Sequence, residues 1–176
     1  MNIRLAAVAA AAMLAAACAK EARQNTDTVA AAAGVPAAVP APTPGAFATT
    51  DFAKLRWLEG RWRGFMPDGG KFYESYVLEN DSTIIKYSYA DTTFRNPSDR
   101  SVIALRGTTV SNDSENGAHW VVTRIDSTGA DFAPARGATN HFTFTREDAT
   151  KWTASLRWTE NGQPKTVVYA LHRFGR

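Results

Sequence analysis

Histidine is the residue type best suited to metal binding or proton transfer near neutral pH, and this chain has three: His119, His141 and His172. No two of them have the H-x-H or H-x-x-x-H spacing that is typical of metal ligands. The pattern G-x-S-x-G, which places a nucleophilic serine on a sharp turn, is also missing from the sequence. We therefore predict no catalytic residues, no metal site and no cofactor.

Glu74 is the charged residue whose surroundings are most informative, because it lies between Phe72 and Tyr76 on one face of an expected strand. A carboxylate on an aromatic face needs a partner if that face is buried. Two interpretations stay open. Glu74 either faces the interior and pairs with Arg157 or Tyr87, or it faces solvent and is hydrated.

Other polar residues near aromatic ones could converge in an apolar cup and contact a ligand. Alternating tyrosines are also typical of any half-buried strand, so the pattern alone does not separate lining residues from outer ones. The candidate ligand-binding residues are Glu74, Tyr76, Tyr87, Asn140, His141 and Arg157.

Cys18 is the one cysteine of the chain, and its position indicates a lipid attachment site. It follows Arg4, an apolar run over residues 5–14 and three alanines, and the run is too short to span a bilayer. This order is typical of bacterial lipoprotein signals, in which the thiol receives a diacylglycerol. We expect a signal peptide over residues 1–17 and a membrane anchor at Cys18. A plain signal peptide with an incidental cysteine is the alternative.

Residues 18–50 are rich in Ala and Pro and predict a disordered tether between the lipid and a folded domain. Ala19, rather than Asp, follows the cysteine, which in Gram-negative lipoproteins implies the outer membrane. The domain would then face the periplasm. The net charge of +3 is small and its basic residues are dispersed, so we expect no nucleic-acid partner.

The domain expected over residues 51–176 contains all five Trp and all five Tyr of the chain. Phe52, Leu55 and Leu58 have helical spacing, and Gly60 follows them. After Gly60 the sequence alternates in short runs separated by turn residues, which predicts about eight or nine strands in an antiparallel up-and-down barrel. Expected strands are residues 61–65, 71–78, 83–90, 101–110 (one strand or two), 119–125, 139–146, 151–159 and 165–174, with 131–138 irregular.

The start of this domain, Leu55-Arg56-Trp57-Leu58-Glu59-Gly60-Arg61-Trp62, resembles the opening of small bacterial lipocalin-like domains of the calycin superfamily. The resemblance implies a calycin-like β-barrel in which Trp62 plugs the closed end. It also implies that an arginine from the last strands packs across that ring, and Arg173 is the best candidate. Some short barrels of this kind hold haem through a histidine near the C-terminus, which makes His172 a minor alternative.

These observations lead to an expected function and two alternatives. We expect an envelope lipoprotein whose barrel binds a small apolar or amphipathic ligand without catalysis. The first alternative is a filled barrel that serves as a structural or protein-interaction module. An enzyme or a haem binder is the weaker alternative.

Overall fold

The apolar residues Phe52, Leu55 and Leu58 define the helical segment at the start of the fold. In the computed structural model, helix α1 (Thr49–Phe52) continues into a 3-10 helix, η1 (Ala53–Leu58). All three side chains are fully buried, and the segment packs against the strands β6 and β7 defined below. Helical spacing in the sequence thus identified the face that is buried.

The structure describes residues 43–175. The expected signal peptide, Cys18 and the tether up to residue 42 lie outside the described residues. Within the described part, no helix has both the length and the hydropathy needed to cross a membrane.

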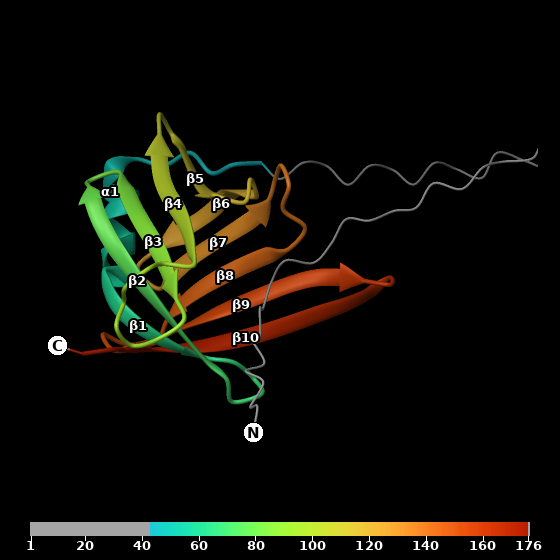
Figure 1. The fold of residues 1–176 in the computed structure, drawn as a ribbon. Helices are drawn as coiled ribbons and strands as arrows, with labels where there is room; N and C mark the ends of the chain where they lie inside the picture. Colours follow the sequence, from blue (N-terminus) through green and yellow to red (C-terminus); the bar gives the residue numbers. More distant parts are fainter. Residues whose placement is uncertain (1–42, 176) are drawn as a thin grey trace, which may run out of the picture. The chain divides into compact units, whose positions relative to one another are not determined.

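Ten antiparallel strands follow the helical segment and close into a barrel (Figure 1). Each strand pairs with its neighbour in the sequence, and the last pairs with the first, so the order is up-and-down throughout. The strands are β1 (Gly60–Phe65), β2 (Lys71–Asn80), β3 (Thr83–Tyr89), β4 (Asp99–Arg106), β5 (Thr109–Ser114), β6 (His119–Asp126), β7 (Gly129–Pro134), β8 (His141–Arg146), β9 (Lys151–Glu160) and β10 (Gln163–Arg173).

The number of strands corrects the expectation of eight or nine. Residues 101–110 form two strands, because the chain turns at Gly107, which has a φ of 63°. Residues 131–134 of the segment expected to be irregular belong to β7, which ends at Pro134. Gly129 lets β7 approach β8 closely, since a Cβ there would lie 1.9 Å from the carbonyl oxygen of Phe144. A glycine that reads as a turn in the sequence is therefore part of the sheet.

Trp62 and Arg173 meet at the end of the barrel that the helical segment covers. The two residues are directly opposite each other in the β1–β10 pair, and the guanidinium carbon of Arg173 lies 4.3 Å from the centre of the Trp62 ring. Arg173 also donates hydrogen bonds to the backbone carbonyls of Glu59, Trp57 and Ala149, at 3.0, 3.3 and 3.2 Å. The structure therefore has the contact that the calycin resemblance implies.

Gly60 makes room for this contact. Its φ is 122°, in a region that favours glycine, and a Cβ there would lie 2.4 Å from Nη1 of Arg173. The Nε1 atom of Trp62 also donates a hydrogen bond to the carbonyl of Leu58 at 2.6 Å. The glycine and the tryptophan two residues later are thus parts of one arrangement.

Residues before the helix are attached to the barrel as well. The N–H of Gly45 donates to the carbonyl of Val122 at 3.0 Å, and the N–H of Phe47 donates to that of Thr108 at 2.8 Å. The packed domain therefore begins before residue 51, the boundary expected from the sequence.

Replacing Arg173 should destabilise the barrel more than replacing an arginine of the outer surface. We expect Arg173→Ala to lower the free energy of unfolding by about 2–3 kcal/mol, because it removes a cation–π contact and charge-assisted hydrogen bonds. Arg173→Lys should lower the free energy of unfolding by an intermediate amount, because an ammonium cannot donate to three carbonyls in the way that a planar guanidinium does. Denaturant unfolding measures both, with Arg136→Ala at an exposed loop as the control. An Arg173→Ala variant as stable as this control would contradict the closing role.

Candidate functional site

Inward-facing side chains divide the barrel interior into a packed half and an open half. Around Trp62 the inner residues are essentially inaccessible, with Ile84, Val110 and Leu171 at 0–1% exposure. Toward the turns after β1, β3, β5, β7 and β9 the inward residues become partly exposed. The inner wall is therefore reachable from solvent at this end, which we call the open half.

A charged cluster lies on the inner face of β2, β3 and β4. The register places Tyr76 opposite Lys86, and Glu74 opposite Ser88, which in turn lies opposite Asp99. The Lys86 ammonium is 3.5 Å from Oε1 of Glu74 and 3.3 Å from Oδ2 of Asp99. Tyr76 donates its hydroxyl hydrogen to Oε2 of Glu74 at 2.9 Å. Glu74, Tyr76, Lys86 and Asp99 are the polar cluster.

Burial and charge change the proton affinities of this polar cluster. Burial raises the pKa of Tyr76 well above 10.0, and the neighbouring charge of Glu74 raises it further. Burial by itself would lower the pKa of Lys86. The charges of Glu74 and Asp99 outweigh that effect and raise it above 10.5. At neutral pH the phenol is therefore neutral and the ammonium is charged.

Two further polar residues extend this inner wall beyond the cluster. Ser101 on β4 is 4% exposed and lies opposite Lys86 in the register. Asn112 on β5 is 8% exposed, and its register partners Ile103 and Trp120 place it on the inner face. Its Oδ1 atom is buried and has no hydrogen-bond partner among the described residues. A buried amide oxygen without a partner is costly, and a bound donor would remove that cost.

The opposite inner wall is apolar and aromatic. Strands β7 and β8 contribute Phe132 and Phe142, whose rings stack at 4.1 Å, and Trp120 meets Phe142 edge-on at 5.4 Å. Phe72 and Tyr169 meet edge-on at 5.6 Å where the wall closes beyond β10. One side of the barrel interior thus carries hydrogen-bonding and charged groups. The other side is aromatic and well packed, with Phe132 and Phe142 only 1% and 7% exposed.

Only two of the six predicted lining residues belong to this inner polar wall. Glu74 faces the interior, with 13% of its side chain exposed, but its partners are Lys86 and Tyr76 rather than Arg157 or Tyr87. Asn140 lies in the loop before β8, where its carbonyl accepts a hydrogen bond from Nε1 of Trp120 at 2.8 Å.

Tyr87 is on the outer face of β3, which corrects its prediction as a lining residue or as the partner of Glu74. It lines an outer groove of about 370 Å³ together with Arg61, Val77, Tyr89 and Phe94. Arg61 lies over the Phe94 ring at 4.9 Å. The tyrosine pattern of β3 is thus that of a strand with aromatic residues on its exterior.

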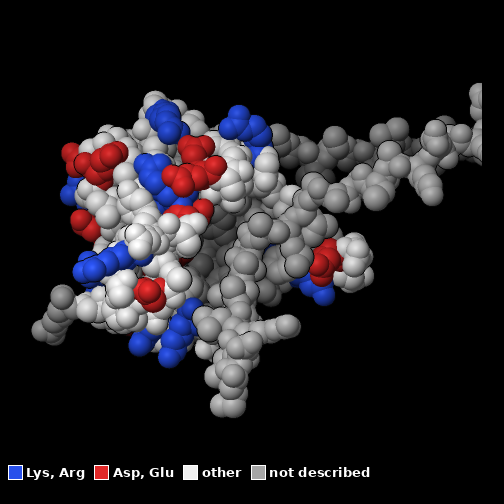
Figure 2. Space-filling view, viewed as in Figure 1, with Lys and Arg blue, Asp and Glu red and all other residues white. Residues whose placement is uncertain are grey.

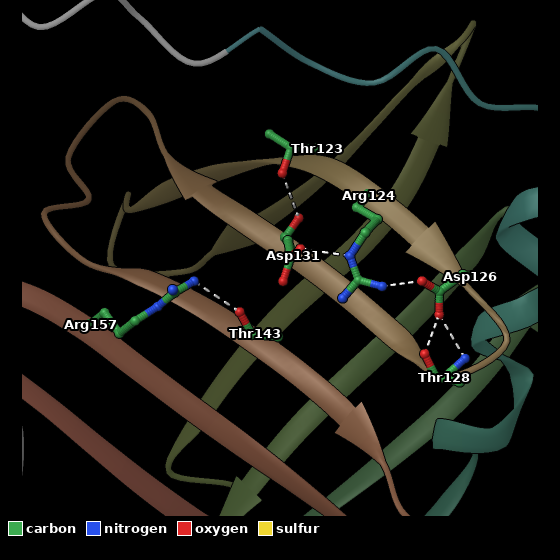
Figure 3. Close-up of polar contacts among 7 residues, drawn as sticks. All are labelled: Thr123, Arg124, Asp126, Thr128, Asp131, Thr143 and Arg157. Carbon is green, nitrogen blue, oxygen red and sulfur yellow. Dashed lines mark hydrogen bonds and ion pairs between the residues drawn. The ribbon is translucent and has the colours of Figure 1, made fainter.

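Arg157 and His141 also face outward, opposite each other in the β8–β9 pair. Nη2 of Arg157 donates to Oγ1 of Thr143 at 3.2 Å, on the outer side of the sheet (Figure 3). The same view shows Arg124 between Asp131 and Asp126, both of which accept hydrogen bonds from it. Arg157 therefore cannot reach Glu74, because the sheet separates them.

The two remaining histidines lie on the exterior too. The ring of His172 meets Phe65 edge-on at 5.2 Å, and Nδ1 of His119 pairs with Asp113. Within residues 43–175, no three His, Cys, Asp or Glu side chains are grouped so that they could hold a metal ion. Figure 2 shows Lys and Arg interspersed with Asp and Glu on the face in view, without a large region of one sign.

Sequence reasoning missed several inner-wall residues, among them Lys86, Asp99 and Asn112. Lys86 had a detectable signal, because a lysine within the apolar run Thr83–Tyr89 is unusual and requires a partner if buried. Asp99 and Asn112 lie beside turn-forming residues, so their types suggested loops. Only the register brings all three to one wall.

Comparisons with known proteins add little to this geometry. No family model matches the chain, and no curated protein matches it. Among solved structures, a redesigned β-barrel is similar over 70% of this chain and 96% of that one, with 13% identity and a TM-score of 0.35. The function proposed below therefore depends on the contacts described above.

Lys86→Met tests the polar cluster through stability. Removing the ammonium leaves Glu74 and Asp99 close together without a counter-charge, and we expect the free energy of unfolding at pH 7 to fall by about 2 kcal/mol. Lys71→Met on the exposed side of β2 makes the same chemical change and should cost much less. Equal losses in the two variants would show that the Lys86 ion pairs do not stabilise the fold.

Alkaline pH should weaken the fold through the same cluster. The pKa values of Tyr76 and Lys86 are both raised on folding, so their stabilising contribution is complete below about pH 10 and is lost as pH rises through the folded values. Denaturant unfolding between pH 9 and 11 should show the fall, and Tyr76→Phe should flatten it. If the free energy of unfolding decreases with pH as steeply in Tyr76→Phe and in Lys86→Met as in the wild type, other groups cause the decrease.

Proposed function

We propose that this chain is an envelope lipoprotein whose calycin-like barrel binds a small apolar or amphipathic ligand without catalysis. The observation that carries the proposal is the division of the barrel interior into a charged wall on β2–β4, partly exposed at the open half, and an aromatic wall on β6–β10. A ligand with one polar end and one apolar end would contact both walls.

Partial exposure of the polar cluster supports access from solvent. The Glu74, Lys86 and Asp99 side chains are 13%, 20% and 39% exposed, so exposure increases from β2 to β4. The packed half around Trp62 would stop a ligand from passing through the barrel. A small molecule that enters at the open half would therefore meet the polar cluster and the aromatic wall together.

The lipoprotein part of the proposal depends on sequence. Cys18 follows an apolar run and small residues, and this part of the chain lies outside the described residues. The calycin assignment is supported by the helical segment, the up-and-down strand order and the stacking of Arg173 on Trp62. An acylated Cys18 would anchor the barrel to a membrane, and we propose the outer membrane with the barrel in the periplasm.

A protein-interaction module is the second candidate, and the outer groove of β1–β3 favours it. The groove combines exposed Val77, at 47%, with Tyr87, Tyr89, Phe94 and Arg61. Aromatic residues and arginine are enriched where proteins bind one another. In this alternative the barrel is a scaffold, and variants of the inner wall would leave binding unchanged.

A pair of tryptophan substitutions separates the two candidates. Leu156→Trp adds bulk to the inner face of β9, whereas Val168→Trp adds it to the outer face of β10, where Val168 is 50% exposed. Titration calorimetry with decanol, at concentrations below its solubility limit, should show binding to the wild type and to Val168→Trp. Leu156→Trp should lose at least about tenfold in affinity, because the added ring occupies the ligand's place.

Native mass spectrometry of protein purified gently from membranes provides a second readout. A discrete extra mass that disappears on denaturation, and that is missing from Leu156→Trp, would agree with a ligand in the barrel. Absence of decanol binding together with a bare protein mass would contradict the ligand-binding proposal.

A further inference from the structure

We infer that the polar end of the ligand is a protonated amine, which the polar cluster binds through Glu74 and Asp99. This inference rests on the proposed function, since it names the chemical class of ligand for the same inner site. It depends on the sign of the charge inside the barrel, on an unsatisfied acceptor elsewhere on the same inner wall, and on the aromatic side chains of the opposite wall.

The polar cluster carries one uncompensated negative charge. Glu74 and Asp99 contribute two carboxylates, and both contact the single ammonium of Lys86. Tyr76 is a neutral phenol at pH 7 and donates its hydroxyl hydrogen to Glu74, so it does not change the charge of the cluster. A partly buried net charge is unfavourable, and a bound cation would neutralise it.

The ion pairs inside the cluster are longer than charge-assisted hydrogen bonds usually are. Lys86 lies 3.3 and 3.5 Å from its two carboxylates, which is longer than the 2.7–2.9 Å that is typical of charge-assisted hydrogen bonds. Asp99 is also the most exposed member of the cluster, at 39%. An ammonium that arrives from the open half would therefore meet Asp99 first.

Asn112 supplies an independent observation that favours a hydrogen-bond donor. Its side chain is more than nine-tenths buried, faces the interior between Ile103 and Trp120, and has an Oδ1 atom without a partner in the described chain. Ser101, the inward residue before Ile103 on β4, lies opposite Lys86, so Asn112 and Lys86 are on the same inner wall. Carboxylates and an amide oxygen are all acceptors, and a primary ammonium has three donors and no acceptor.

The aromatic wall suits the rest of such a ligand. Trp120 and Phe142 lie on the inner faces of β6 and β8, and the face of an aromatic ring attracts a cation and its neighbouring methylene groups. A carboxylate ligand would instead have to compete with Glu74 and Asp99 for Lys86, at a site that is already negative. The charge balance therefore favours an amine over a fatty acid of the same length.

Three probes of equal length test the inference: decylammonium, decanoate and decanol. We expect calorimetric titrations at pH 7 to rank decylammonium first and decanoate last. Glu74→Gln and Asp99→Asn should each weaken decylammonium by about tenfold, as expected for the loss of a charge-assisted contact, and leave decanol unchanged. Glu79→Gln makes the same charge change at an exposed position of β2 and should bind like the wild type.

The outcomes separate this inference from the function on which it rests. Decanol binding with no preference for decylammonium over decanoate would overturn the amine assignment and keep the ligand-binding barrel. Failure of all three probes to bind the folded wild type would overturn both. Glu74→Gln could also unfold the barrel, so thermal melting is measured for Glu74→Gln and for Asp99→Asn. The decylammonium affinity of whichever variant is folded then tests the amine assignment.

Discussion

The contact of Arg173 with Trp62 is the constraint on which the rest of the barrel depends. An up-and-down sheet closes only if its first and last strands pair, and here β1 and β10 pair over four residues, from Trp62 opposite Arg173 to Phe65 opposite Ala170. Arg173 reinforces this short pairing by hydrogen bonds to carbonyls of the helical segment and of the turn before β9. The same contact requires a glycine at position 60, because any Cβ there would displace the guanidinium. The same few residues therefore close the barrel, position Trp62 and set the direction in which the chain enters β1.

Closing the barrel at one end determines where an interior site can lie. The helical segment and Trp62 fill that end, so inner residues remain partly exposed only toward the other end. Since each strand pairs with its neighbour in sequence, residues on consecutive strands also become neighbours on the inner wall. Glu74, Lys86 and Asp99 come from β2, β3 and β4 in that way, and the aromatic wall comes from β6 to β10. The two chemically different walls thus follow directly from the order of the strands.

The sequence predicted the barrel class, the helical face and the Trp62–Arg173 contact, but it did not predict the inner wall. Alternation was informative in β9, where Trp152, Ala154 and Leu156 do face inward. In β2 the alternation did not show which residues face inward, because both faces of the strand carry aromatic residues. Phe72 packs inside against Tyr169, while Tyr73 packs outside against Phe94 and Phe174. The partner of Glu74 was also inaccessible to pattern reasoning, since it depends on the β2–β3 register, which shifts between Leu78 and Asn80. Strand positions are local properties of a sequence, whereas a pair across strands is set by turns and bulges.

The polar cluster lies in a part of the barrel that apolar side chains could also have filled. Replacing a buried ion pair by apolar residues of similar volume is often neutral or stabilising, because the charges must be dehydrated. The same barrel shows that apolar packing is available to it, since the half around Trp62 is filled by Ile84, Val110, Leu171 and Trp152. The carboxylate excess of the polar cluster and, among the described residues, the unpartnered Oδ1 atom of Asn112 are therefore energetic costs of the unbound state, as is the unpartnered Nε1 atom of Trp152 in the packed half. Bound ligand of opposite charge would reduce the cost of the carboxylate excess, and the reduction would itself contribute to affinity.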